Sequence, residues 1–508
     1  MTLQTTTETL DMGKARKDNE DLEETASIAV GQHIQQQKPF TLWSAMGIGH
    51  SITNTAIGII VGLASGVAFG GSPVFFYGFI LLAIIALFVA ISLGELSSAF
   101  PHPGGQYFWV ATLAPPRFRR FLSYITGIIA WAGALCTTAS VCLAVPIIVF
   151  NMSALASPSF HYKPWMGFLG YQVTNILAFF FNLFERVLPW ASRVTLAYTV
   201  TAVTVVFVAL LAGNTEKQSA QGVFVRLYNI SGWPDPVAFM LGLNSCSWAF
   251  SCLDAVVHLA DEIPEPRRNI PKALLCTVAL GSFTGFPIII ALFFSTTELD
   301  TVATAGTPSL QIFYQAFHNN TAAAIGLQTL VTISAAASII GLHTWQSRMA
   351  WAFSRDKGFP FHRYLGQIAP APFDTPIWAH VWSCCWTAAL GCLYLGSTLA
   401  FNSLVAGGIL LQYLTYAISV ACLLYHGRSK IDHGPFWFPK LGYVTNVVTL
   451  VWTVFALVFY SFPYYLPVRA DQMNYVSCVV AGVLVYAVSY WVLYGRRKYR
   501  LPERRIYD

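Results

Sequence analysis

Residues 42–70 read LWSAMGIGHSITNTAIGIIVGLASGVAFG and contain no Asp, Glu, Lys or Arg. As a helix, this stretch is long enough to cross a hydrocarbon core about 30 Å thick. Its centre is nevertheless small and polar, at Gly47, Gly49, His50, Ser51, Thr53, Asn54 and Thr55. An interruption here exposes backbone groups at membrane depth, which is tolerated where they line a cavity. The stretch favours a broken helix around a small solute, with tight packing of small residues as the alternative.

The composition identifies a polytopic membrane protein. The 508 residues are 55% hydrophobic and only 10% charged, whereas soluble domains carry about 25% charged residues. We predict a disordered cytosolic tail at 1–40, a twelve-helix membrane domain at 41–495 and a basic cytosolic tail at 496–508. After the first span, the expected spans lie near 74–94, 122–150, 168–184, 194–213, 238–260, 273–295, 322–352, 378–396, 401–426, 443–462 and 474–494.

The distribution of basic residues predicts the orientation. With twelve spans both tails share one side, and that side receives all but four of the 29 Lys and Arg residues. The four exceptions are Lys163, Lys217, Arg226 and Arg469. Because basic loops stay in the cytosol, both tails are expected there. Three glycosylation sequons, at Asn151, Asn229 and Asn319, all fall in the expected outer loops.

A second interrupted helix occurs five spans after the first. Residues 238–260 read AFMLGLNSCSWAFSCLDAVVHLA, again with a small and polar centre. Paired interruptions at spans 1 and 6 predict an all-α fold with a 5+5 inverted repeat, followed by two C-terminal helices. The predicted substrate-binding residues are Gly47, Gly49, His50, Ser51, Thr53, Asn54, Trp131, Ser245, Trp248 and Ser251.

Three titratable residues follow the second interruption. Asp254, His258 and Glu262 are spaced four residues apart, so they form one polar stripe if this half of the span is an α-helix. A carboxylate such as Asp254 is expensive inside a bilayer and needs a partner, a proton or a ligand. Two interpretations stay open, a proton path and a hydrogen-bonded network that locks the half-helix.

Several long motifs resemble a known family. Residues 95–101 (ELSSAFP), 104–109 (GGQYFW) and 261–271 (DEIPEPRRNIP) are similar to loops of the amino acid–polyamine–organocation superfamily. Motifs similar to those of its fungal amino acid/choline transporter branch occur at 47–49 (GIG), 113–116 (LAPP), 248–254 (WAFSCLD), 343–348 (HTWQSR), 353–358 (FSRDKG) and 433–437 (HGPFW). The match is nearest to fungal choline permeases and more distant to 4-aminobutyrate permeases. It implies proton-driven uptake of a small amine or amino acid across the plasma membrane by alternating access.

The substrate is left open at this point. His50 stands where the choline type commonly has Phe, so choline, amino acids, 4-aminobutyrate and polyamines all remain candidates. A non-transporting nutrient sensor on the same fold is the alternative function. The eleven histidines are scattered and the ten cysteines lack a CxxC spacing, so we expect no enzyme, cofactor or metal site. The expected partners are the substrate, protons and the lipid bilayer, with no nucleic acid.

Overall fold

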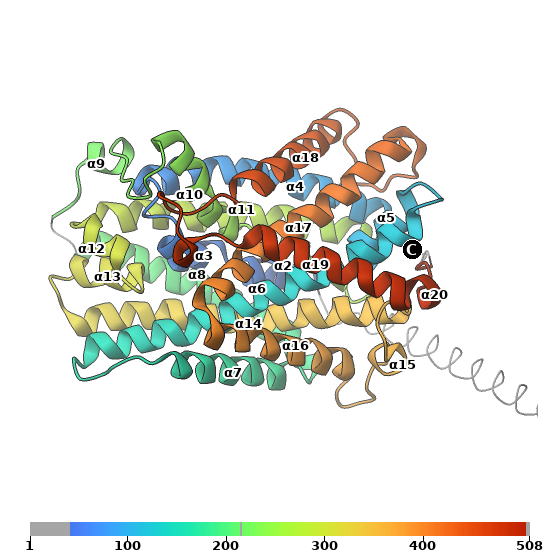
Figure 1. The fold of residues 1–508 in the computed structure, drawn as a ribbon, viewed down its shortest axis with the longest axis horizontal. Helices are drawn as coiled ribbons and strands as arrows, with labels where there is room; N and C mark the ends of the chain where they lie inside the picture. The colour runs from blue at the N-terminus through green and yellow to red at the C-terminus, as the bar shows by residue number, and fades with distance from the viewer. Residues whose placement is uncertain (1–40, 214–215, 504–508) are drawn as a thin grey trace, which may run out of the picture.

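The computed structural model describes residues 41–213 and 216–503, which fold into helices joined by loops (Figure 1). The predicted tail at 1–40 lies outside the described residues, and the predicted tail at 496–508 is described as far as residue 503. The long helices lie side by side and roughly along the longest axis of the molecule (Figure 1).

Ten helical stretches in the described chain are long and apolar enough to cross a membrane. They are α2–α3 (Leu42–Thr53, Thr55–Gly62), η2–α4 (Val74–Gly78, Phe79–Ala99), α6 (Arg119–Ala156), η3–α8 (Glu185–Val187, Leu188–Gly213), α10–η4 (Asp235–Ala249, Leu253–Leu259), α11 (Pro266–Phe294), α14 (Thr321–Arg355), α17 (Thr398–His426), α18 (Leu441–Phe459) and α19–η7–α20 (Val476–Tyr490, Trp491–Gly495, Arg496–Lys498).

Two less apolar helices complete the twelve predicted spans. They are α7 (Pro164–Phe181) and α16 (Ile377–Gly396), with 18 and 20 residues. The two helices pack against each other, and each also packs against α6 and α14. Shorter helical pieces occupy the connections: η1 (Leu63–Ser65), α5 (Gln106–Leu113), α9 (Ala220–Phe224), α12 (Leu299–Thr304), α13 (Pro308–Ala316), α15 (His362–Leu365), η5 (Arg428–Lys430) and η6 (Ala470–Gln472).

Helix lengths and packing agree with the predicted repeat. Spans 1 and 6 are both broken, and spans 3 and 8 are the two longest helices, α6 with 38 residues and α14 with 35. The equivalent helices α4 and α11 pack on each other, as do α6 and α14. After the ten repeat spans, α18 packs on α4 and α17, and α19 packs on α17 and α6.

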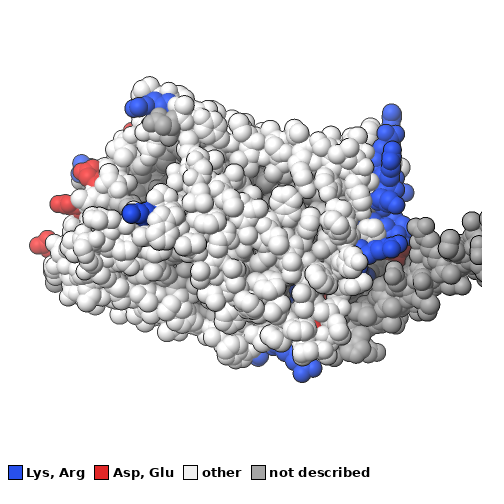
Figure 2. Space-filling model, turned by 60° about the horizontal axis from the view of Figure 1, so that its bottom comes forward, with Lys and Arg blue, Asp and Glu red and all other residues white. Residues whose placement is uncertain are grey.

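Charged residues concentrate at the two ends of the molecule. In Figure 2, many Lys and Arg side chains gather at one end, and a broad band with few charges separates the two ends. The elements α15 and α20, which belong to predicted inner segments, lie at one end, whereas α9, α12 and α13 lie at the other (Figure 1). At the first end, Arg120 at the start of α6 donates to the Tyr499 carbonyl at 2.6 Å.

Candidate functional site

The first interrupted span breaks at a single residue, Asn54. Its backbone is left-handed, with φ 40° and ψ 53°, so α2 ends before it and α3 begins after it. Asn is one of the few residues besides Gly that adopts this conformation readily. Its side-chain amide donates to Ser338 Oγ at 2.8 Å and Ser334 Oγ at 3.1 Å on α14. The break is narrower than the sequence suggested, because residues 47–53 remain helical.

Two of the predicted glycines permit close helix packing. A Cβ at Gly47 would lie 3.2 Å from the Ser192 carbonyl oxygen on α8. A Cβ at Gly49 would lie 2.6 Å from Thr277 Oγ1 on α11. These contacts place α2 against both neighbouring helices. Within this part of the predicted site, the two glycines therefore act through packing.

The polar residues beside the break keep hydrogen-bonding capacity. Both ring nitrogens of His50, the hydroxyls of Thr53 and Thr55 and the Oδ1 of Asn54 are buried without a hydrogen-bond partner in residues 41–213 and 216–503. Leaving a buried polar atom unpaired costs about 1–3 kcal/mol. Such a concentration of unpaired atoms within six residues is typical of a segment that receives a ligand.

The second interrupted span opens over residues 250–252. Helix α10 ends at Ala249, Cys252 has a left-handed backbone with φ 64°, and the 3₁₀ helix η4 follows. The freed Cys252 N–H donates to Gln412 Oε1 on α17 at 2.8 Å. Ser251 Oγ donates to the Trp248 carbonyl at 2.8 Å. This break therefore turns backbone groups toward side chains of span 10.

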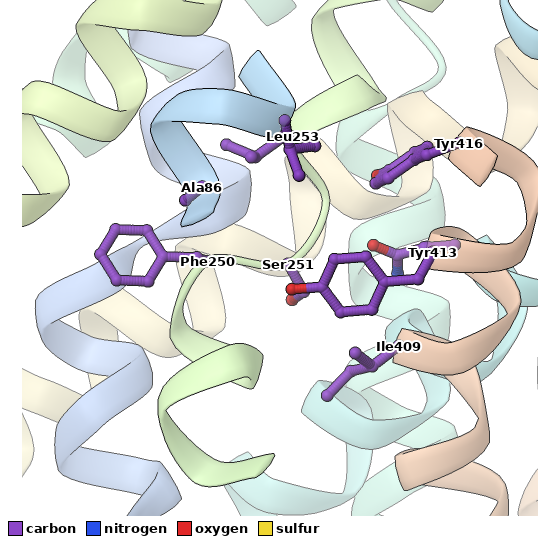
Figure 3. Close-up of a pocket in the computed structure, with 9 residues that line it drawn as sticks. Ala86, Phe250, Ser251, Leu253, Ile409, Tyr413 and Tyr416 are labelled. Carbon is purple, nitrogen blue, oxygen red and sulfur yellow. The ribbon is translucent and has the colours of Figure 1, made fainter. Parts of the chain in front are cut away.

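A small cavity lies beside this second break (Figure 3). Its walls come from α4, the interrupted segment and α17, and the residues are Ala86, Val89, Phe250, Ser251, Leu253, Ile409, Gln412, Tyr413 and Tyr416. All nine lining residues are uncharged, and three carry aromatic rings. The interior has room for about one water molecule, so it is too small for an organic molecule in this conformation.

One cavity residue reaches a buried carboxylate. Tyr416 donates its hydroxyl to Asp254 Oδ1 at 2.5 Å. Gln106 Nε2, at the start of α5, donates to Asp254 Oδ2 at 2.7 Å. The same Oδ2 lies 3.3 Å from His258 Nε2, and His258 Nδ1 lies 2.8 Å from the Pro103 carbonyl oxygen. Asp254 therefore joins span 10, span 6 and the loop that precedes α5.

The hydrogen bonds of His258 determine which of its ring nitrogens faces Asp254. The Pro103 carbonyl can only accept, so His258 Nδ1 carries a hydrogen. A neutral His258 then presents a lone pair at Nε2, which would repel a charged Asp254 oxygen 3.3 Å away. The contact is favourable when one proton sits between them, on the imidazole or on the carboxyl.

Glu262, the third residue of the expected stripe, has other partners. It accepts from Arg348 Nε on α14 at 2.7 Å, and Arg348 also forms an ion pair with Glu185 of η3. The three side chains are largely buried. The stripe thus separates into the Asp254–His258 pair and a group of ion-paired residues that ties the end of span 6 to spans 5 and 8. Both the proton-path and the locking interpretations have residues that suit them.

Comparison with known proteins identifies the family. A family model described as amino acid permease matches residues 40–484. The chain belongs to this family. A transmembrane transporter, swnT, of Metarhizium robertsii is 48% identical over 92% of this chain and 94% of its own length. The swainsonine transporter swnT of Arthroderma benhamiae is 47% identical, covering 92% and 93%. The choline transporter of Saccharomyces cerevisiae is 40% identical, covering 95% and 86%.

The resemblance to the amino acid–polyamine–organocation superfamily and the transporter class are thereby confirmed. The chain is a multi-pass integral membrane protein that transports rather than catalyses, and we refer to it as the permease. The sequence did not single out Gln106, Gln412, Tyr413 and Tyr416. Nothing in the sequence pairs Tyr416 with Asp254, since 162 positions separate them.

Other predicted site residues of the permease lie outside the cavity lining. Trp131 donates to Ser383 Oγ on α16 at 3.1 Å, and its ring centroid lies 4.7 Å from that of Phe359. Ser245 is buried on α10. Trp248 is half-buried, one turn before the break. Ser51 is buried and donates to the Ile48 carbonyl at 3.1 Å. These placements leave their roles in substrate binding as predictions.

The three sequons of the permease differ in accessibility. Asn151 donates to Thr307 Oγ1 at 2.7 Å, and Asn229 donates to the Trp233 carbonyl at 2.7 Å. Both asparagines are half-buried. Asn319 is exposed in the connection between α13 and α14. Of the three predicted glycosylation sites, Asn319 has the geometry best suited to modification.

Proposed function

We propose that this permease imports a small organic amine together with a proton by alternating access. The observation that carries the proposal is the chain of contacts from the cavity to the Asp254–His258 pair. Tyr416 lines the cavity and donates to Asp254, whose Oδ2 lies 3.3 Å from His258 Nε2. A substrate that binds beside Tyr416 is then one hydrogen bond away from the group that carries the proton.

The lining of the cavity favours a cationic or amine substrate. Phe250, Tyr413 and Tyr416 offer aromatic faces, which attract ammonium groups by about 2 kcal/mol or more when water is excluded. Ser251 and Gln412 add neutral polar groups that can orient the substrate. The relatives named for swainsonine and choline agree with a small nitrogen compound as substrate. An amino acid would place its carboxylate at the N-terminus of α3, beside Asn54.

Coupling follows from the geometry of the Asp254–His258 pair. With its proton present, the contact between Asp254 and His258 is attractive and holds η4 against the loop at Pro103. When the proton leaves, the lone pair of Nε2 faces a carboxylate oxygen and the contact becomes repulsive. Loss of the proton toward the cytosol therefore loosens the inner half of span 6. Substrate release on that side would accompany the loss.

The broken helices are suited to move as one unit. Gly58 of α3 packs so closely on α10 that a Cβ there would lie 3.0 Å from Ala249 Cα. Helices α4 and α11 pack on this pair, while α6 and α14 pack on each other beyond it. Rocking of the first group against the second would expose the cavity alternately to each side. The ion pairs that Arg348 makes with Glu185 and Glu262 would break and form again during this cycle.

The orientation proposed is that of a plasma-membrane importer with both tails in the cytosol. The bias of Lys and Arg toward one set of loops supports this orientation, since basic loops are retained inside. The end of the molecule that carries α15 and α20 would face the cytosol. Asn319 and its sequon would then face outward.

Uptake in a transporter-deficient host tests the proposal. The panel is choline, ethanolamine, swainsonine, 4-aminobutyrate, neutral and basic amino acids, and spermidine, each with and without a proton uncoupler. We expect saturable uptake of an amine that the uncoupler suppresses. Uptake of amino acids alone would overturn the substrate class, and uptake that is insensitive to the uncoupler would overturn proton coupling. No uptake of any compound, with surface expression verified, would favour the nutrient sensor.

A further inference from the structure

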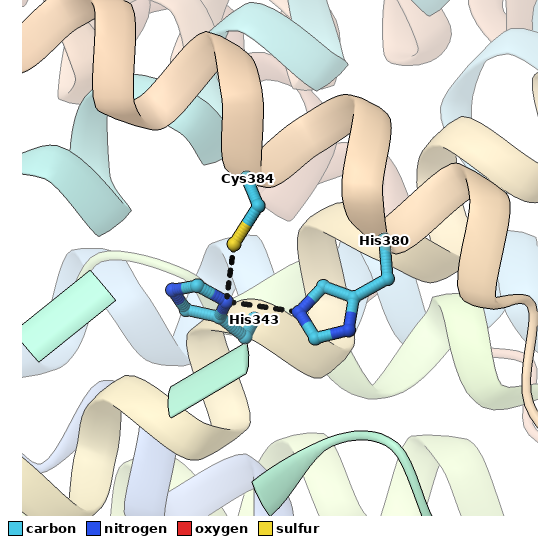
Figure 4. A group of neighbouring side chains, drawn as sticks. All are labelled: His343, His380 and Cys384. Carbon is cyan, nitrogen blue, oxygen red and sulfur yellow. Dashed lines mark hydrogen bonds between the residues drawn. The ribbon is translucent and has the colours of Figure 1, made fainter. Parts of the chain in front are cut away.

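Two histidines and a cysteine, none of which lines the cavity, converge between α14 and α16 (Figure 4). His343 Nδ1 lies 3.0 Å from His380 Nε2 and 3.7 Å from Cys384 Sγ. The three potential ligand atoms all lie within 4.8 Å of one another. His343 and His380 are buried, and Cys384 is partly buried. His380 and Cys384 are four residues apart on α16, which places them on one face of that helix.

Hydrogen bonds pair His343 with His380 and the Cys384 thiol with Asn175 Oδ1, but they leave one imidazole nitrogen of the cluster without a partner among the described residues. His343 Nδ1 carries either one lone pair or one hydrogen, so it can form one good hydrogen bond. Yet both His380 Nε2 and Cys384 Sγ approach it. The other ring nitrogen, His343 Nε2, is buried without a partner in the described part of the chain. Three potential ligand atoms gathered within 4.8 Å of one another form a group that could hold a metal ion.

The separations agree with metal coordination. With metal–nitrogen bonds of about 2.0–2.1 Å and a metal–sulfur bond of about 2.3 Å, three ligands at about 120° separate two nitrogens by about 3.5 Å and nitrogen from sulfur by about 3.8 Å. The two nitrogens are 3.0 Å apart, His343 Nδ1 lies 3.7 Å from Cys384 Sγ, and all three atoms lie within 4.8 Å of one another, so coordination needs shifts of about half an ångström to one ångström. Asn175 Oδ1 lies 3.4 Å from Cys384 Sγ, and the Phe179 ring packs on His380 with centroids 4.7 Å apart. These neighbours hold two of the ligands in place.

The charge of the site selects the ion. One thiolate and two neutral imidazoles carry a total charge of −1, so a monovalent ion gives a neutral complex. A divalent ion would leave a positive charge in a low-dielectric interior, which is unfavourable. Thiolate and imidazole ligands also suit Cu(I). We propose that His343, His380 and Cys384 form a Cu(I) site that joins α14 to α16, two helices that both pack against α6.

Metal titration of the purified full-length permease tests this site. The protein in detergent would be titrated anaerobically with Cu(I) against a colorimetric Cu(I) chelator, with Ag(I) as a second probe and Zn²⁺ as a third. We expect one equivalent of Cu(I) and of Ag(I) per chain, together with a higher thermal unfolding temperature. Cys384→Ser should weaken Cu(I) binding by at least about 100-fold, and Cys385→Ser, which alters an exposed neighbour, should leave it unchanged.

A second variant distinguishes loss of the metal site from misfolding. His380→Gln keeps a polar side chain at the same position and should also lose the Cu(I) while eluting as a monodisperse protein. Equal Cu(I) binding by wild type, Cys384→Ser and His380→Gln would overturn the site. Absence of stoichiometric binding by the wild type would do the same. Binding of Zn²⁺ in preference to Cu(I), with loss in the same variants, would overturn the choice of a monovalent ion.

Discussion

Replacing Tyr416 with Phe removes the single hydroxyl that joins the cavity to Asp254. That hydroxyl donates at 2.5 Å to a carboxyl oxygen, and a hydrogen bond to a charged group contributes about 1.5–3 kcal/mol. Because about 1.4 kcal/mol is a factor of ten, the change should reduce proton-driven uptake by about 10- to 100-fold. Asp254 keeps Gln106 and His258 as partners, so the fold should persist.

The assay compares two modes of transport in proteoliposomes. Initial uptake under an acid-outside gradient requires coupling, whereas counterflow without a gradient requires only binding and exchange. Tyr416→Phe should lose the uptake driven by the acid-outside gradient, and its counterflow rate should stay within about threefold of the wild-type rate. Tyr413→Phe is the matched control, because it lines the same cavity while its hydroxyl interacts with Ser247 and Trp452. If Tyr416→Phe accumulates substrate as the wild type does, the hydroxyl does not couple the cavity to Asp254.

Three further outcomes follow from the packing and exposure of particular residues. Arg348→Met leaves two buried carboxylates without their cationic partner and should destabilise the protein by about 3–5 kcal/mol in thermal unfolding. The control, Arg268→Ala, removes an exposed ion pair and should destabilise it by less than about 1 kcal/mol. Asn319→Gln should abolish a glycosidase-sensitive gel shift that single substitutions at the other two sequons leave intact. Gly58→Val should abolish transport despite surface expression, because its Cβ would press on the α10 backbone at 3.0 Å; normal transport by this variant would contradict joint movement of α3 and α10.

The architecture was predictable because it depends on patterns that repeat along the chain. Apolar runs located the twelve spans, and polar centres in spans 1 and 6 marked both breaks. The sequence also predicted that the outer half of span 1 begins near Asn54 or Thr55, and α3 begins at Thr55. The bonds from Asn54 to Ser334 and Ser338 on α14, which hold the break in place, were not predictable in this way.

The side-chain groups were less predictable, because distant segments build them. An ideal α-helix would align Glu262 with Asp254, but η4 is a 3₁₀ helix and Arg348 of α14 pairs with Glu262. His343 and His380 are 37 positions apart, so no short sequence spacing predicts their contact. The expectation of no metal site considered only spacings within one segment.

Proton movement during substrate transport tests the central claim most directly. The purified permease would be reconstituted with a pH-sensitive dye inside the vesicles, and the best substrate of the panel would be added outside without a gradient. We predict that the vesicle interior acidifies as substrate enters. Asp254→Asn should exchange labelled substrate in counterflow without moving protons. Substrate entry through the wild type without acidification would contradict proton coupling. If Asp254→Asn moves as many protons per substrate molecule as the wild type does, Asp254 and His258 do not couple protons to transport.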